Sequence, residues 1–161
     1  MILWKVFETY LDTPLLIIES ELKSPNLGFE NEKILSRLKV TNNGVTTAKN
    51  CIIRIENIFC NEVQNGSNNN KDIEFLEPMN LRWAGTEKEH VDISPRSYYY
   101  IPLLSYRKFN GPPRLNTYNS GKHPFIGNLK FTITVYPNNA KPTFKNFKYS
   151  DAPRITIEEI L

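Results

Sequence analysis

The chain has few of the residues that build metal centres. Its 161 residues include two cysteines and two histidines, His90 and His123. A zinc site needs three or four converging His, Cys or carboxylate ligands. Neither histidine has a second histidine or a cysteine two or four residues away. We therefore expect no metal site and no cofactor.

Crosslinks, membrane spans and leader sequences are equally scarce. Cys51 and Cys60 lie nine residues apart in what reads as one strand, and nine extended residues cover roughly 30 Å. A disulfide needs Cα atoms within about 7 Å, so two free thiols are expected. No apolar run approaches the ~20 residues of a membrane span, and no secretory signal precedes Pro14. These features favour a reducing compartment and predict a cytoplasmic protein with no membrane span.

Catalytic motifs are missing too. The chain has no Gly-rich phosphate loop, nucleophile elbow or HExxH sequence. The pairs Glu19/Glu21 and Glu30/Glu32 each share one face of a strand, which favours a solvated face. Cys51 belongs to an apolar alternation and reads as a small hydrophobic residue, although spacing leaves a Cys–His pair open. We predict no catalytic residues and no enzyme activity, unless a deep pocket joins a histidine to a carboxylate.

Acidic residues are absent from one long stretch. Residues 93–150 hold nine Lys and Arg and no Asp or Glu, although the whole chain carries only +3. Sheet pairing could interleave this stretch with the acidic remainder, which is the favoured interpretation. Alternatively, the stretch forms a basic patch that attracts anionic partners.

What the chain does contain is short alternating segments and turn residues. Leu129, Phe131, Ile133 and Val135 alternate with polar residues, as a half-buried strand requires. Asn42-Asn43-Gly44 predicts a turn in which Asn and Gly adopt positive φ. Proline interrupts two further strands, at Pro78 and Pro102, and predicts edges or bulges there. Short strands are expected at 15–22, 34–41, 48–59, 73–83, 91–93, 98–104, 129–135, 143–149 and 155–160, with a long polar loop over 107–124. This pattern predicts an all-β antiparallel sandwich.

Several short motifs carry a resemblance. The run from Leu38 to Cys51, with Asn43-Gly44 at its turn, resembles the strand–turn–strand signature of bacterial and archaeal immunoglobulin-like modules, including the cell-adhesion-related bacterial domain. Leu81-Arg82-Trp83, Asp92-Ile93-Ser94-Pro95 and Val135 to Pro142 extend the similarity to a group of uncharacterised prokaryotic proteins. The resemblance spans roughly residues 15–160. It implies an immunoglobulin-like β-sandwich over 13–161, after a short helix or juxtamembrane remnant at 1–12. Where that group has glycine this chain has Arg96, which leaves the turn geometry open.

Two candidate functions follow. Trp83 is expected in the core, whereas alternation sends Tyr98 and Tyr100 to one face and Tyr99 to the other. Aromatic and basic residues together suit single-stranded nucleic acid or nucleotides. The candidate binding residues are therefore those of the basic loop: Arg107, Lys108, Arg114, Tyr118 and Lys122. The favoured function is a non-catalytic protein-interaction or sensing module of a larger protein or assembly, working by edge-strand addition. The alternative is an anion-binding module that uses residues 93–150.

Overall fold

A computed structural model describes residues 12–21, 32–61, 72–107, 114–115, 128–150 and 156–160. At several strand ends only the backbone is described, so side chains are discussed for 12–21, 36–59, 77–104, 128–150 and 157–160. The expected helix within residues 1–12 lies outside the described residues up to Leu11. No helix occurs in the described part of the chain.

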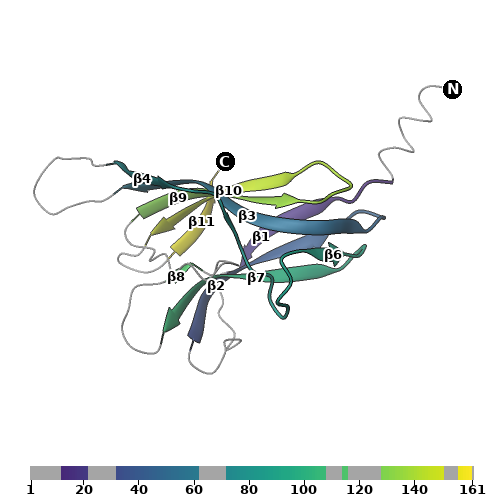
Figure 1. The fold of residues 1–161 in the computed structure, drawn as a ribbon, viewed down its shortest axis with the longest axis horizontal. Helices are drawn as coiled ribbons and strands as arrows, with labels where there is room; N and C mark the ends of the chain where they lie inside the picture. Colours follow the sequence, from purple (N-terminus) through teal and green to yellow (C-terminus); the bar gives the residue numbers. More distant parts are fainter. Residues whose placement is uncertain are drawn as a thin grey trace, which may run out of the picture.

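The described strands form two antiparallel sheets that pack together as a sandwich (Figure 1). The smaller sheet has the order β1-β2-β7-β8, and the larger has the order β11-β10-β9-β3-β4, with β5 and β6 also paired to β3. The bounds are β1 Leu16–Glu21, β2 Glu32–Asn42, β3 Ala48–Asn61, β4 Asp72–Leu76, β5 Met79–Asn80, β6 Val91–Ile93, β7 Tyr98–Arg107, β8 Arg114–Leu115, β9 Asn128–Tyr136, β10 Thr143–Ser150 and β11 Thr156–Ile160. The all-β sandwich prediction is confirmed. Two expected elements were wrong. The expected loop over 107–124 includes β8, which pairs with Leu104 and Ser105 of β7. The expected strand over 73–83 is divided at Pro78 into β4 and β5, and β5 ends at Asn80.

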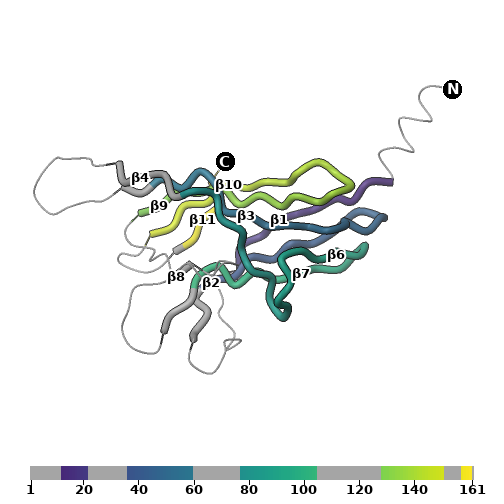
Figure 2. The backbone as a smooth tube through the Cα atoms, in the orientation of Figure 1, coloured from purple at the N-terminus to yellow at the C-terminus, as the bar shows by residue number. Residues whose placement is uncertain are grey.

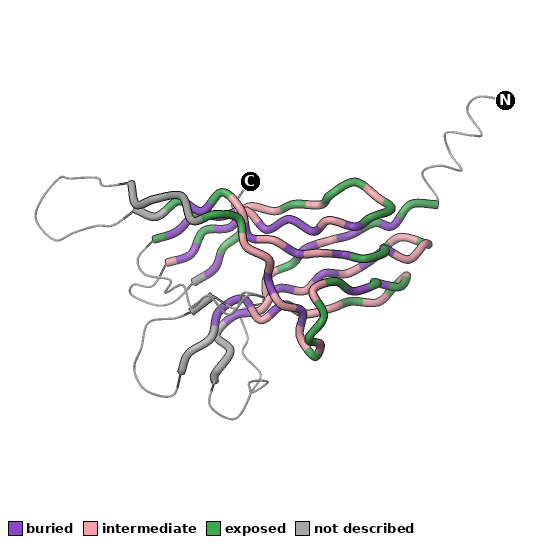
Figure 3. The backbone as a smooth tube through the Cα atoms, in the orientation of Figure 1, coloured by how far each residue is buried: buried purple, intermediate pink, exposed green. Residues whose placement is uncertain are grey.

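The core lies between the sheets, and along β3 and β9 buried residues alternate with more exposed ones (Figure 3). Trp83 is 1% exposed, which confirms its predicted place in the core. Phe131 and Phe147 stack on adjacent strands with ring centroids 5.7 Å apart. Cys51 is also buried and forms no disulfide.

The side chain of Asn42 hydrogen-bonds to three separate segments of the chain at one end of the sandwich. The Asn42 side chain is buried, and its Oδ1 accepts hydrogen bonds from the backbone N–H groups of Leu15 (3.1 Å) and Gly44 (3.0 Å). Its Nδ2 donates to the carbonyls of Thr46 (2.7 Å) and Ile93 (2.9 Å). These four bonds use both sides of the amide and connect β1, the β2–β3 turn and β6.

The Asn42-Asn43-Gly44 turn forms as expected, but for a different reason. Neither Asn43 nor Gly44 adopts positive φ. A Cβ on Gly44 would instead lie 2.5 Å from the Leu15 nitrogen and 2.7 Å from the Thr13 oxygen. Glycine is therefore required because the segment before β1 crosses the turn at close range.

Positive φ occurs elsewhere. Asn50 (φ 48°) and Asn57 (φ 49°) both lie at register shifts of β3, where asparagine tolerates the left-handed region of a bulge. Arg96 has φ 58°, so the turn after Pro95 adopts the left-handed conformation despite the missing glycine. Its backbone N–H donates to the Asn42 carbonyl at 2.8 Å, and this bond holds the turn in place.

Both long sides of the sandwich are covered within the described part of the chain. On one side β1 lies against β10 and β11, and the Lys145 ammonium donates to the Ile18 carbonyl (3.0 Å) while it pairs with Glu159 (2.5 Å). On the other side residues 81–97 connect β5 of the larger sheet to β7 of the smaller sheet (Figure 2). The Ala84 N–H donates to the Tyr100 carbonyl at 2.8 Å. Pro102 lies on this covered side of β7, near the register shift at Ser36 and Arg37. Pro78 is exposed between β4 and β5, both of which pair with β3 alone.

Candidate binding surfaces

The outer face of the smaller sheet displays two tyrosines that cations hold in place. Tyr98 and Tyr100 contact each other edge-to-face, with ring centroids 5.1 Å apart. The Arg37 guanidinium carbon lies 3.9 Å from the centroid of the Tyr100 ring, and the Lys39 ammonium lies 4.7 Å from that of Tyr98. Each contact is a cation–π interaction. Alternation along β7 placed these rings correctly, because Tyr98 and Tyr100 share a face and Tyr99 turns inward against Trp83.

Acidic residues flank the same cations on the edge strand β1. Glu19 lies opposite Lys39 in the register, and Glu21 lies opposite Arg37. The Arg37 Nε donates to Glu21 Oε2 at 2.8 Å, and its Nη2 lies 2.6 Å from the same oxygen. We call Glu19, Glu21, Arg37, Lys39, Tyr98 and Tyr100 the tyrosine face. The tyrosine face carries two formal charges of each sign, so it is electrically balanced. The two cation–π contacts and the Arg37–Glu21 pair hold its side chains in place.

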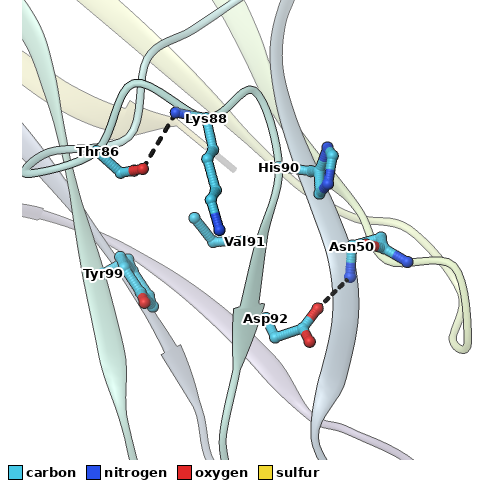
Figure 4. A pocket seen from close by; sticks show the side chains of 7 residues that line it. All are labelled: Asn50, Thr86, Lys88, His90, Val91, Asp92 and Tyr99. Atoms are coloured by element: carbon cyan, nitrogen blue, oxygen red, sulfur yellow. Dashed lines mark hydrogen bonds between the residues drawn. The ribbon is translucent and has the colours of Figure 1, made fainter.

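A polar recess of about 430 Å³ opens beside residues 81–97 (Figure 4). It is lined by Asn50, Thr86, Lys88, His90, Val91, Asp92 and Tyr99. One Asp92 oxygen accepts a hydrogen bond from the Asn50 N–H at 2.8 Å, and the Lys88 N–H donates to the Thr86 hydroxyl at 3.1 Å. His90 and Asp92 therefore line the same recess, which is part of what the enzyme alternative requires.

No activated nucleophile accompanies that pair among the described residues. Cys51 is the register partner of Val91, next to Asp92, but burial and then the Asp92 carboxylate raise the pKa of its thiol to about 12. The thiol is thus protonated at neutral pH, and a protonated thiol is a poor nucleophile. His90, Lys88 and Asp92 are exposed side chains on the rim. The recess has the volume of a small-ligand site.

The outer face of the larger sheet carries a hydrogen-bonded polar network. The Glu56 carboxylate accepts from the Thr134 hydroxyl (2.8 Å) and from the Tyr136 hydroxyl (2.8 Å). Partial burial, followed by this hydrogen bond and the Glu56 charge, raises the pKa of Tyr136. Thr132 donates to Asn146 Oδ1 at 2.9 Å in the next row. The network satisfies its own acceptors, because both carboxylate oxygens and the amide oxygen are used.

Further along this face two lysines lie directly opposite each other. Lys130 of β9 and Lys148 of β10 are register partners, and both side chains are exposed. Phe59 of β3 is the register partner of Lys130 on its other side, and Glu158 of β11 is that of Lys148. Motif reasoning missed this row because it depends on which strands pair. The charge count supplied the one sequence signal, since both lysines belong to the acid-free stretch.

Of the five binding residues predicted from the sequence, the structure describes the backbone of two. Arg107 ends β7 opposite Glu32, and Arg114 begins β8 opposite Ser105, but only their backbone is described. Lys108, Tyr118 and Lys122 lie outside the described residues, as does His123. The favoured interleaving of charges is seen at Lys145, which pairs with Glu159. It fails at Lys130, whose register neighbours are Phe59 and a second lysine.

Among the described residues, no group of three or more His, Cys, Asp or Glu side chains converges as metal ligands. None of the described residues forms a helix of the length and hydropathy that crosses a membrane. Comparison of the chain with protein-family models, curated proteins and solved structures finds no significant match in any of the three.

Proposed function

We propose that this chain is a non-catalytic protein-recognition module, with an immunoglobulin-like sandwich, that serves a larger protein or assembly through the tyrosine face. One observation carries the proposal: Tyr98 is 51% exposed, yet Tyr100 and Lys39 hold its ring in a defined position. Tyrosine and arginine are the residues that most often dominate protein interfaces. Rings that are already ordered lose little conformational entropy when a partner binds.

The charge pattern favours a protein over a polyanion at this face. Glu19 and Glu21 lie beside Lys39 and Arg37, so a chain of phosphates would meet both attraction and repulsion. Arg37 is also engaged by Glu21, and its guanidinium lies over Tyr100. A protein surface can offer complementary charges to the two glutamates and to the two basic residues, and an apolar pocket to the tyrosine rings.

Edge-strand addition, the mode expected from the prolines, finds less support. The β1 edge is occupied at Ile18 by Lys145, and the β7 edge is occupied at Tyr100 by Ala84. A lysine that bonds to an edge carbonyl is a device that discourages strand pairing. The proposal therefore rests on a sheet face rather than a sheet edge.

A comparative pull-down tests the proposal. Immobilised wild-type chain, a Tyr98→Thr/Tyr100→Thr variant and a Phe144→Thr variant are incubated with a lysate of the organism that encodes the chain. Phe144 is the control because it is 66% exposed but lies on the other sheet. Threonine suits exposed strand positions, and thermal unfolding verifies that all three proteins fold.

The expected result is a protein retained by the wild type and by Phe144→Thr but lost by the double tyrosine variant. Lys39→Gln should reduce its retention as well, since this change removes the cation over Tyr98. Equal retention of every protein by all the variants would contradict the proposal. A partner lost only with Phe144→Thr would move the recognition surface to the larger sheet.

A further inference from the structure

The Lys130–Lys148 pair lies where sheet architecture alone would not favour it. Like charges directly opposite each other on one face of an antiparallel pair destabilise the sheet. Their side chains project on the outer face of the larger sheet, between Phe59 and Glu158 in a single row. Phe59 is 49% exposed, which is unusual for a large apolar ring.

Little negative charge in the described residues compensates this pair. Neither Lys130 nor Lys148 forms an ion pair there, whereas Lys145 on the same strand pairs with Glu159. Glu56, one row away on β3, directs its carboxylate to Thr134 and Tyr136. Glu158 is the carboxylate in the row, and it borders Lys148 alone.

The residues on both sides of the row offer hydrogen-bond donors. Ser150 donates to Asn128 Oδ1 at 2.7 Å, and Thr132 donates to Asn146 Oδ1 at 2.9 Å. The side-chain oxygens of Asn128 and Asn146 are thereby used as acceptors. The Nδ2 group of each residue is the donor that remains for a ligand. Two ammonium groups flanked by two amide donors favour a ligand rich in negatively charged oxygen acceptors.

We propose that Phe59, Asn128, Lys130, Asn146 and Lys148 form a binding site for single-stranded nucleic acid. The ammonium and amide groups contact backbone phosphates, and the exposed Phe59 ring stacks on a base. Positive charge along a strand pair beside an aromatic ring is the combination that sequence-independent single-strand binding uses. The site is independent of the tyrosine face, because it lies on the other sheet.

Fluorescence anisotropy of a labelled single-stranded oligothymidylate tests this site at low and at moderate salt. The lysine variant is Lys130→Gln/Lys148→Gln. Its matched control is Lys49→Gln/Lys141→Gln, which removes the same charge from two exposed lysines at the opposite end of the sheet, near the β9–β10 turn. Phe59→Ser tests the ring, and heparin serves as a polyanion without bases.

The expected result is binding to the wild type that weakens about tenfold or more in the lysine variant and less in its control. The slope of log affinity against log salt should fall by about 1.4, because each lost phosphate contact on a single strand contributes about 0.7. Phe59→Ser should weaken oligonucleotide binding and leave heparin binding unchanged.

Three results would overturn the proposal. The first is no anisotropy change with the wild type at low salt. The second is an equal loss in the lysine variant and its charge-matched control, which would reflect net charge rather than a site. The third is lysine dependence without Phe59 dependence, which would identify a general polyanion surface instead of a nucleic-acid site.

Discussion

Replacement of Asn42 should unfold this domain more readily than any other single polar substitution among the described residues. Its side chain makes four hydrogen bonds, to Leu15, Gly44, Thr46 and Ile93, and is fully buried. A buried hydrogen bond contributes about 1 kcal/mol net, and a buried partner left unsatisfied costs about 1–3 kcal/mol. Asn42→Ala should therefore lower the free energy of unfolding by about 3–5 kcal/mol, a large share of the roughly 5–15 kcal/mol of a typical domain.

Urea unfolding monitored by tryptophan fluorescence measures this loss, because Trp83 moves from the core to water. Asn43→Ala is the matched control, since Asn43 is the exposed neighbour, and it should cost less than about 0.5 kcal/mol. Asn42→Asp keeps an acceptor for the N–H groups of Leu15 and Gly44. Its second carboxylate oxygen, however, faces the carbonyls of Thr46 and Ile93 and repels them. Protonation turns that oxygen into a donor, so the Asp variant should regain stability as the pH falls, whereas Asn42→Ala should not.

The reasoning would be refuted if Asn42→Ala cost no more than its Asn43 control. It would also fail if the Asp variant showed the same pH dependence as the Ala variant. Either result would mean that the turn, β1 and β6 are held by packing and by backbone bonds, and that the Asn42 amide is dispensable.

Four further predictions concern the backbone and the buried thiol. Gly44→Ala should cost about 2 kcal/mol or more in urea unfolding, because the new Cβ would lie 2.5 Å from the Leu15 nitrogen; a neutral effect would contradict the close approach. Arg96→Gly should raise the thermal midpoint and add about 1 kcal/mol, since glycine adopts the observed φ of 58° without strain, whereas Arg96→Ala should change little. In a Cys60→Ser background, the Cys51 thiol should react with a thiol reagent only at the rate of unfolding, and fast reaction of the native protein would contradict its burial. Because folding raises the pKa of Cys51 from 9.0 to about 12, its contribution to stability should be complete below pH 9 and be lost as the pH rises towards 12, as alkaline urea titrations can measure.

Only part of the lining of the recess around His90 can be predicted from the local sequence. His90 and Asp92 are two residues apart, so alternation alone places them on one side of a strand. The contribution of Asn50, Thr86 and Tyr99 depends on how residues 81–97 cross between β3 and β7. No local pattern in the sequence encodes that crossing.

Most strand positions and the core followed from the sequence because side-chain alternation is a local property. The inward set of β9, the burial of Trp83 and the division of Tyr98 and Tyr100 from Tyr99 all depend on a period of two. The requirement for Gly44 was foreseen for the wrong reason, since its cause is the approach of Leu15, which is 29 positions earlier in the chain. Arg96 likewise adopts a glycine-like φ because Asn42, distant in sequence, holds its N–H.

By itself, the sequence determined that this protein is all-β, where its apolar faces lie and that its basic residues gather in one stretch. Only the tertiary structure decided which residues become neighbours across strands: Arg37 with Tyr100, Lys39 with Tyr98, and Lys130 with Lys148. The physical reason is that alternation specifies the face of a side chain but not the partner strand or its register. Register is set by the whole core, and both proposed binding surfaces depend on it.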